Sequence, residues 1–394
     1  MEYSPPPSAR PFSLHVSDAD LSTFRLLLEL SRLGPLTYDN EFEDGRYGIP
    51  YRWLSHAKEY WLSKFDWRTQ ERYVNSFPNY KMRIEDKKGA VDMHFIGVWS
   101  CKPDVKPLVL LHGWPGSFLE FLPALEILNA RYGTNLPFHV IVPSLPGYTL
   151  SSGPPTGVEW KAEDAARIVH SLLTGLGFSQ FIVQGGDVGS WIAALLATTY
   201  KEVIGIHLNL LVTLDPVDPG DPELSDLERM VVERGRKRFR APTTGAAIMN
   251  STRPATVGAM LHSNPLSLLA WTAEKLREWP EEPFSLAEIL TSTSLWWFTE
   301  SAARSVYTYR LTFGCSDYKA EYPYFDKPFG YSWFMHELMP APRKNVDCKG
   351  DLVFYRQHEK GGHFAAKEQP TQFVNDMEEF VQTVLTTLKS RNIA

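Results

Sequence analysis

Cysteine is scarce in this sequence of 394 residues, which contains only Cys101, Cys315 and Cys348. Three is an odd number, and the spacing does not match that of a metal site, so neither a disulfide framework nor a cysteine-rich metal centre is expected. Such cysteine usage is typical of a reducing compartment, and we therefore expect a cytoplasmic protein.

Long apolar runs and an excess of basic residues are also absent. No stretch approaches the roughly 20 apolar residues that cross a bilayer, and the segment from Met1 to Pro7 lacks the basic and then apolar pattern of a signal peptide. The formal net charge of −6 offers no electrostatic footprint for nucleic acid or an anionic membrane. We expect no nucleic-acid partner and no membrane anchor.

A strand, a turn and a helix follow one another near the middle of the chain. The apolar run Phe181 to Val183 leads into Gln184-Gly185-Gly186-Asp187-Val188-Gly189-Ser190, and an apolar helical pattern begins at Trp191. Small residues on both sides permit the sharp turn of a nucleophile elbow, which lifts one side chain above a parallel sheet. Asp187 is then the nucleophile, and a carboxylate that attacks carbon forms an ester that must be hydrolysed. A glycine-rich turn before an N-cap aspartate is the simpler alternative.

A second turn of this kind lies earlier in the chain. The apolar run Leu108 to Leu111 ends in His112-Gly113-Trp114-Pro115-Gly116-Ser117, a loop type that supplies a backbone N–H to an oxyanion hole. With Asp187 as nucleophile, the two donors are the N–H groups of Trp114 and Val188. Pro and Gly occur in turns of every kind, but two such turns in this order, each after an apolar strand, favour the catalytic interpretation.

With these two motifs the chain resembles the soluble fungal branch of the microsomal-type epoxide hydrolases, in the α/β-hydrolase superfamily. The resemblance implies an α/β-hydrolase fold with an N-terminal meander and an inserted helical lid. It also implies an epoxide hydrolase that uses a small-molecule epoxide and water, without cofactor or metal. The substrate skeleton, its stereochemistry and the formation of a homodimer stay open. The further motifs that carry the resemblance are Pro143-Ser144-Leu145-Pro146-Gly147-Tyr148, Ser251-Thr252-Arg253-Pro254, Lys327-Pro328-Phe329-Gly330 and Gly361-Gly362-His363-Phe364-Ala365-Ala366.

Periodicity divides the chain into three parts. Residues 1–97 are rich in aromatics without a regular rhythm and are predicted to form the meander. From the run Val91 to Ile96 onward, strands and helices alternate, which predicts a mainly parallel sheet in a core of residues 98–214 and 326–394. The helical lid is predicted over 215–325; it begins with a Pro- and Asp-rich linker at 215–222, and amphipathic helices follow. The predicted strands are Leu108 to Leu111, Val140 to Val142, Phe181 to Val183, Ile204 to Leu208 and Leu352 to Tyr355, and the predicted helices are Ala162 to Leu176, Leu227 to Arg238, Gly258 to Leu261, Ser267 to Trp279 and Ser285 to Arg304.

The resemblance also assigns the partners of the nucleophile. His363 follows the last predicted strand, where the family places its base, and an unperturbed histidine is partly neutral at working pH. The acid that orients His363 maps onto Glu337. Asp347 and Asp351 are the alternatives for this acid.

The family stabilises the opened epoxide oxygen with two lid tyrosines, because a phenol with a pKa near ~10 donates a proton without being ionised beforehand. The second tyrosine maps onto Tyr309, which the local motif favours over Tyr307. The first position holds Ala246, five residues before Ser251. Loss of one such donor costs about 10²–10³-fold in rate.

Other side chains are candidates to compensate for the missing phenol: Thr243, Thr244 and Asn250. The small side chain at Ala246 also suggests a larger pocket ceiling. We predict that His112, Pro115 and Ala246 contact the substrate.

Three functions compete. An epoxide hydrolase with one lid tyrosine, acting in detoxification or secondary metabolism, is favoured. An epoxide-opening cyclase or isomerase would direct a substrate hydroxyl onto the epoxide, but it would not need the retained Asp187, His363 and Glu337. The same three residues disfavour a non-catalytic binding protein. Haloalkane dehalogenases also use an elbow aspartate, but they commonly carry tryptophan where this chain has Val188.

Overall fold

The computed structural model describes residues 3–212, 217–239, 242–311 and 322–391. In these ranges a nine-stranded sheet forms the centre of the molecule, in the order β1-β2-β3-β5-β4-β6-β7-β8-β9. Cys315 lies outside the described residues. The strands are β1 (Arg10–Pro11), β2 (Asn79–Ile84), β3 (Val91–Val98), β4 (Pro107–Leu111), β5 (His139–Pro143), β6 (Phe181–Gly185), β7 (Val203–Leu208), β8 (Phe325–Phe334) and β9 (Gly350–His358).

The sheet is antiparallel at one end and parallel elsewhere. β1, β2, β3 and β5 pair antiparallel, and every pair from β5 and β4 through to β9 is parallel. All residues of β4, β5 and β6 are buried, because helices cover both faces of a parallel sheet. The predicted α/β-hydrolase fold and its five predicted strands are confirmed.

The structure differs from the prediction at both ends of the sheet. β1 and β2 lie inside the segment 1–97 that was predicted to be the meander, whereas β3 begins at Val91, where the strand rhythm was expected to start. β2 alternates polar residues with aromatic or aliphatic ones along its whole length, the period of two that is typical of a strand with one buried face, and the prediction of a meander overlooked this pattern. β8 was not predicted as a strand, because Pro328 interrupts its apolar pattern; in the structure Pro328 lies at an irregularity in the pairing with β9.

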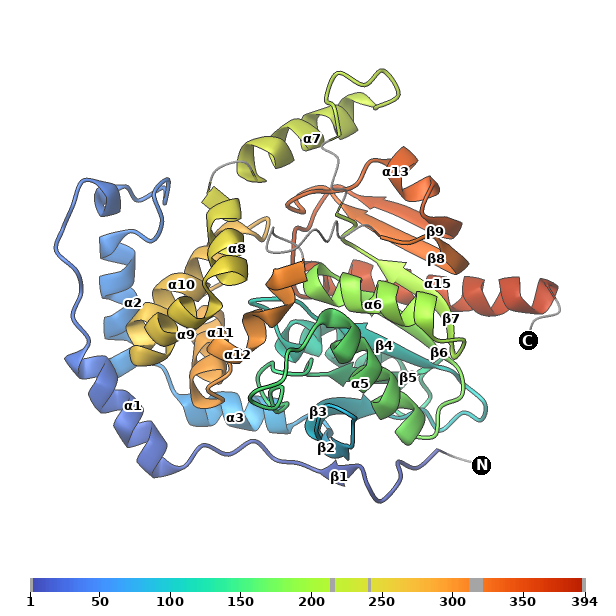
Figure 1. Cartoon of the computed structure of the whole chain (residues 1–394), viewed down its shortest axis with the longest axis horizontal. Helices are drawn as coiled ribbons and strands as arrows, with labels where there is room; N and C mark the ends of the chain where they lie inside the picture. The colour runs from blue at the N-terminus through green and yellow to red at the C-terminus, as the bar shows by residue number, and fades with distance from the viewer. Residues whose placement is uncertain (1–2, 213–216, 240–241, 312–321, 392–394) are drawn as a thin grey trace.

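Helices form a layer on each face of the sheet (Figure 1). α5 (Ala162–Gly175) and α6 (Asp187–Thr199) pack together on one face, while α4 (Leu122–Tyr132) and α15 (Pro370–Ser390) pack together on the other. The short helices α13 (Arg343–Asp347) and α14 (Ala365–Glu368) flank β9 in sequence. The α6 face that meets the sheet is made of small and aliphatic residues, which allows close packing beneath the elbow.

A group of helices is inserted between β7 and β8, and Figure 1 shows most of it gathered beside one end of the sheet. The predicted helix from Ser285 to Arg304 is in fact two helices, because Glu300 between them adopts a left-handed φ of 50° that ends α-helical hydrogen bonding. The inserted elements are α7 (Asp226–Phe239), α8 (Pro242–Thr252), α9 (Pro254–Ser263), α10 (Pro265–Glu278), α11 (Leu286–Phe298), α12 (Ala302–Ser305) and η3 (Val306–Leu311).

The N-terminal meander packs against this lid. α1 (Asp18–Leu30), η1 (Asp39–Glu41), α2 (Tyr51–Ser63) and α3 (Trp67–Asn75) lie along its outer side in Figure 1. The Ser31 hydroxyl donates to Asn264 before α10 at 2.9 Å, and the Trp61 indole N–H donates to Ser294 in α11 at 3.2 Å. The meander therefore holds lid helices in place.

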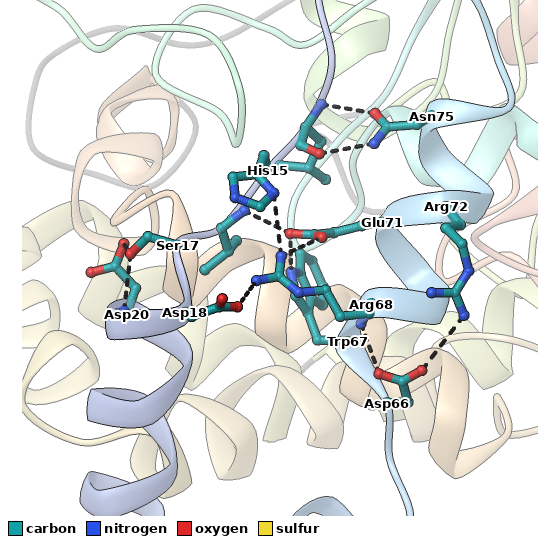
Figure 2. Close-up of polar contacts among 12 residues, drawn as sticks. His15, Ser17, Asp18, Asp20, Asp66, Trp67, Arg68, Glu71, Arg72 and Asn75 are labelled. Carbon is teal, nitrogen blue, oxygen red and sulfur yellow. Dashed lines mark hydrogen bonds and ion pairs between the residues drawn. The ribbon is translucent and has the colours of Figure 1, made fainter.

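A buried carboxylate joins the start of the meander to α3 (Figure 2). Glu71 is 5% exposed. One carboxylate oxygen accepts the backbone N–H of Val16 at 2.6 Å and the indole N–H of Trp67 at 2.9 Å. The other accepts from Arg68 at 2.6 Å. Because a buried carboxylate is stable only when its lone pairs are satisfied, Glu71 fixes these segments together.

Cys101 and Cys348 are both free thiols. Among the helices of the described ranges, none combines the length and the apolar character that a membrane span requires.

Candidate active site

The predicted elbow is present between β6 and α6. Asp187 is the first residue of α6 and has a left-handed φ of 47°, a conformation that costs free energy in a non-glycine residue. Neighbouring glycines permit it. A Cβ on Gly185 would lie 2.3 Å from the Gly189 carbonyl oxygen, and a Cβ on Gly189 would lie 2.1 Å from that of Leu111. The elbow therefore requires glycine at both positions.

The loop after β4 supplies a hydrogen bond to Asp187. The backbone N–H of Trp114 donates to Asp187 Oδ1 at 2.7 Å. The N–H of Val188 lies in the first turn of α6, where N–H groups have no partner within the helix and the positive end of the dipole favours an anion. Glycine at position 113 allows the loop to approach the Asp187 side chain closely. A Cβ on Gly113 would lie only 2.2 Å from the Cβ of Asp187. Of the two predicted oxyanion donors, the Trp114 N–H thus contacts the Asp187 carboxylate directly, while the role of the Val188 N–H stays a prediction.

His363 lies between Asp187 and Glu337. His363 Nε2 is 3.4 Å from Asp187 Oδ2, and its Nδ1 is 2.7 Å from Glu337 Oε1. The His363 and Glu337 side chains are 2% and 1% exposed. The alternative acids lie elsewhere, in partly exposed ion pairs: Asp347 with Arg343, and Asp351 with Arg391. The geometry therefore favours Glu337 as the residue that orients His363.

The charges around His363 control its protonation. Burial alone lowers the pKa of His363, but the charges of Glu337 and Asp187, together with the hydrogen bond to Glu337, outweigh burial, so the pKa rises well above its usual value of 6.5. Before reaction His363 is accordingly an imidazolium between two carboxylates. Removing the charge of either carboxylate favours the neutral imidazole.

Tyr309 lies in η3 on the lid side of this group. Its ring meets that of Trp114 edge to face, with centroids 5.7 Å apart and an interplanar angle of 88°. Burial, followed by the charges of Asp187 and Tyr148, raises the pKa of Tyr309 well above 10, so the phenol stays neutral and can donate. Tyr307 instead donates its hydroxyl to the Pro146 carbonyl at 2.9 Å. The structure therefore favours Tyr309 over Tyr307.

The position of the missing tyrosine is also on the lid. Ala246 lies in α8, which packs against the η3 segment that carries Tyr309. Asn250, one turn along α8, is fully buried, and neither atom of its amide has a hydrogen-bond partner among the described residues. The side chains of Thr243 and Thr244 lie outside the described residues.

His112 holds the oxyanion loop. One ring nitrogen is 3.0 Å from the Gly113 carbonyl oxygen, and the other accepts the Leu145 N–H at 3.1 Å. Burial lowers the pKa of His112 to about 4, so the ring is neutral. This geometry favours a loop-fixing role over the substrate contact predicted for His112. Pro115 lies in the same loop, and its carbonyl oxygen accepts the Trp296 indole N–H of the lid at 2.9 Å.

Sequence reasoning did not find Tyr322, which braces the elbow. Its hydroxyl is 2.6 Å from that of Ser190, which in turn lies 2.5 Å from the Asp187 carbonyl oxygen. The Tyr322 ring stacks on Trp191, with centroids 3.9 Å apart. Because Tyr322 precedes β8 and is far from the elbow in sequence, no local pattern connects the two.

The fold and the site together define an α/β-hydrolase that carries a carboxylate on its nucleophile elbow. The chain matches the family model described as epoxide hydrolase N terminus over residues 9–121, and that of the alpha/beta hydrolase fold over residues 106–246. The structure of Aspergillus niger epoxide hydrolase is 41% identical with a TM-score of 0.90, and covers 97% of this chain and 99% of its own. Epoxide hydrolase 1 of Sus scrofa is 33% identical over 95% of this chain and 88% of its own length.

The similarity extends to an insect enzyme. The juvenile hormone epoxide hydrolase of the silkworm Bombyx mori is 25% identical, with a TM-score of 0.83, over 98% of this chain and 99% of that one. This chain therefore belongs to the epoxide hydrolase family. The matches do not favour the alternative of a cyclase or isomerase.

Proposed function

We propose that this epoxide hydrolase opens an apolar epoxide to a vicinal diol through an ester on Asp187. One observation carries the proposal: the side chains of Asp187, His363 and Glu337 lie in a row, and His363 and Glu337 are buried while Asp187 is partly exposed. Asp187 Oδ1 receives the Trp114 N–H, while Asp187 Oδ2 lies 3.4 Å from His363 Nε2. His363 is in turn 2.7 Å from Glu337.

In the first half-reaction Asp187 Oδ2 attacks an epoxide carbon. A C–O bond of the ring breaks, and the oxygen that receives the electron pair takes the phenolic proton of Tyr309. Asp187 Oδ1 becomes the carbonyl oxygen of the ester and keeps its hydrogen bond to the Trp114 N–H, and the Val188 N–H at the start of α6 is the proposed second donor. These donors can stabilise the negative charge that develops on Oδ1 when water attacks the ester carbonyl carbon.

Formation of the ester changes His363 into a base. Because the ester is neutral, one of the two charges that keep the proton on His363 disappears. The released proton replaces the one that Tyr309 donated. Neutral His363 can then accept a proton from water while the water oxygen attacks the Asp187 carbonyl carbon.

The ester C–O bond then breaks. The departing diol oxygen takes the proton from His363, and the regenerated carboxylic acid of Asp187 gives its own proton to His363. The starting ion pair is restored. Glu337 keeps the His363 ring oriented, with Nε2 toward Asp187, throughout both half-reactions.

Isotope labelling tests the covalent route. In a single turnover in oxygen-18 water with excess enzyme, we expect label on the Asp187 carboxylate, while the first diol contains an oxygen from the protein. His363→Gln should accumulate alkylated protein, which intact-mass measurement detects as an increase equal to the substrate mass. Label in the first diol would contradict the nucleophilic role of Asp187.

We further infer that the enzyme works in a reducing compartment such as the cytoplasm. Cys101 and the exposed Cys348 are both free, which suits such a compartment. Thiol counting on protein isolated without reductant tests this inference.

A further inference from the structure

A small cavity lies beside Asp187 and His363. Its volume is about 20 Å³, and its polar side chains are Asp187, His363, Glu120 and Asn209. A water molecule needs at least about 10–15 Å³ of such space and two to four polar partners. The cavity therefore accommodates one water molecule and is too small for an organic substrate.

The proposed base faces this cavity without a fixed partner at one nitrogen. His363 Nε2 is buried, and no described residue makes a hydrogen bond of good geometry with it; its ion pair with Asp187 spans 3.4 Å. A water in this cavity would be able to satisfy Nε2, and Asp187, whose ester carbon it must attack, lines the same cavity. The other hydrogen of that water needs an acceptor.

Glu120 has no role in the proposed mechanism so far. It lies in η2 (Phe118–Phe121), directly after the oxyanion loop, and the Ser117 hydroxyl accepts the Leu119 N–H at the start of this turn. The loop packs closely over the carboxyl group: a Cβ on Gly116 would lie 3.0 Å from Glu120 Oε2. The same loop that carries the Trp114 donor therefore fixes the position of Glu120.

The surroundings of Glu120 keep its carboxyl group neutral. Burial and the charge of Asp187 raise the pKa of Glu120 and outweigh His363, the Gly113 N–H and Lys367, which lower it, so that the pKa is about 8. A neutral acid adds no third negative charge beside Asp187 and Glu337, and its carbonyl oxygen can still accept a hydrogen bond from water.

We propose that Glu120 positions the water that hydrolyses the Asp187 ester. This water donates one hydrogen bond to His363 Nε2 and the other to a carboxyl oxygen of Glu120, which directs a lone pair of the water toward the ester carbon. Glu120 accepts no proton in the step: the proton passes to His363 as the new C–O bond forms. This inference rests on the proposed function of the site.

A second cavity offers a source for this water. It has a volume of about 290 Å³ and is lined by Glu120, Phe364, Gln70, Tyr73 and Lys367 among others. Glu120 and Phe364 line both cavities. Glu120 thus stands between a larger space and the one-water site.

The test compares the two half-reactions in Glu120→Met, which keeps an unbranched side chain but removes the acceptor. With styrene oxide in a single turnover, rapid quenching and intact mass follow the ester. In Glu120→Met we expect the ester to form at the wild-type rate. We expect its hydrolysis to be slowed about 10²-fold, because the attacking water is no longer held in position. Glu120→Gln retains a carbonyl oxygen, so it should slow hydrolysis by about tenfold at most, the value of one hydrogen bond.

Two further variants serve as an alternative to Glu120→Met and as a control for general structural effects. Glu120→Asp withdraws the carboxyl group by one methylene and should also slow hydrolysis alone; it serves if Glu120→Met does not fold. Glu71→Gln is the matched control, because Glu71 is a buried glutamate outside the site. We expect Glu71→Gln to lower thermal stability without lengthening the life of the ester.

The outcomes separate this inference from the proposed function. If wild-type protein forms no ester, the nucleophilic role of Asp187 fails. If the ester forms but Glu120→Met hydrolyses it at the wild-type rate, only the role of Glu120 is overturned. Equal slowing of both half-reactions, or an equally long-lived ester in Glu71→Gln, would also overturn it, because either result would indicate a general structural effect.

Discussion

Replacing Glu337 by glutamine tests how the triad is held together. Glu337 Oε1 lies 2.7 Å from His363 Nδ1 and also accepts the Leu338 N–H at 2.6 Å. Among the described residues, no hydrogen-bond partner reaches Oε2. In Glu337→Gln the amide oxygen should therefore take the place of Oε1, because the NH₂ group there would face the N–H of Leu338. The His363 tautomer is then preserved, and only the charge is lost.

The expected loss in the rate of ester hydrolysis follows from the hydrogen bond between Glu337 and His363, which changes from a charged to a neutral one. A hydrogen bond to a charged group contributes about 1.5–3 kcal/mol and a neutral one about 0.5–1.5 kcal/mol. The difference of about 1–1.5 kcal/mol corresponds to roughly tenfold in rate. A reversed tautomer would be far more costly, about 10⁴-fold in a serine-protease triad. We expect ester hydrolysis in Glu337→Gln to fall about tenfold, with ester formation little changed.

The assay is single-turnover rapid quench with intact-mass detection, repeated across pH. Loss of the Glu337 charge lowers the pKa of His363, so the rise of ester hydrolysis with increasing pH should move to lower pH. Circular dichroism and thermal unfolding control for the fold. A loss near 10⁴-fold with the fold intact would refute the argument that Leu338 fixes the amide orientation.

Three further substitutions test other parts of the structure. Gly113→Ala places a Cβ 2.2 Å from that of Asp187 and should slow ester formation about 10²-fold; Gly34→Ala, where no described atom outside the local chain lies within 4 Å, should leave it unchanged. Ala246→Tyr should speed the ring opening of styrene oxide by up to about 10²-fold, measured as the rate of ester formation; no gain would show that Ala246 does not stand where the phenol is missing. Glu71→Gln should lower the free energy of unfolding by about 2 kcal/mol in a denaturant titration, and an unchanged midpoint would mean that the contacts of Figure 2 add no net stability.

The sequence alone was sufficient for the elbow, the oxyanion loop and the parallel core. Each depends on local features: apolar runs specify buried strands, and glycines at fixed spacing permit the backbone turn at Asp187. It was not sufficient for β8, because Pro328 obscures the strand pattern and only pairing between β7 and β9 makes the segment a strand.

Tertiary structure decided which of several similar side chains meet in the site. Glu337, Asp347 and Asp351 are all acids near the end of the chain, but only Glu337 lies beside His363. Tyr307 and Tyr309 are only two positions apart, yet the Tyr307 hydroxyl already donates a hydrogen bond to the backbone carbonyl of Pro146. Such choices depend on contacts between residues far apart in sequence, for which no spacing rule exists.

The roles of His112 and Glu120 also depend on the folded structure. His112 belongs to the oxyanion motif, and only the packing of the loop against Leu145 shows that its ring nitrogens are already engaged. Glu120 lies in an apolar run without any catalytic pattern, and folding brings it to the same cavity as Asp187 and His363. Local sequence thus specifies how the backbone turns, whereas the packing of distant segments determines which polar groups lose their contact with bulk water and face one another.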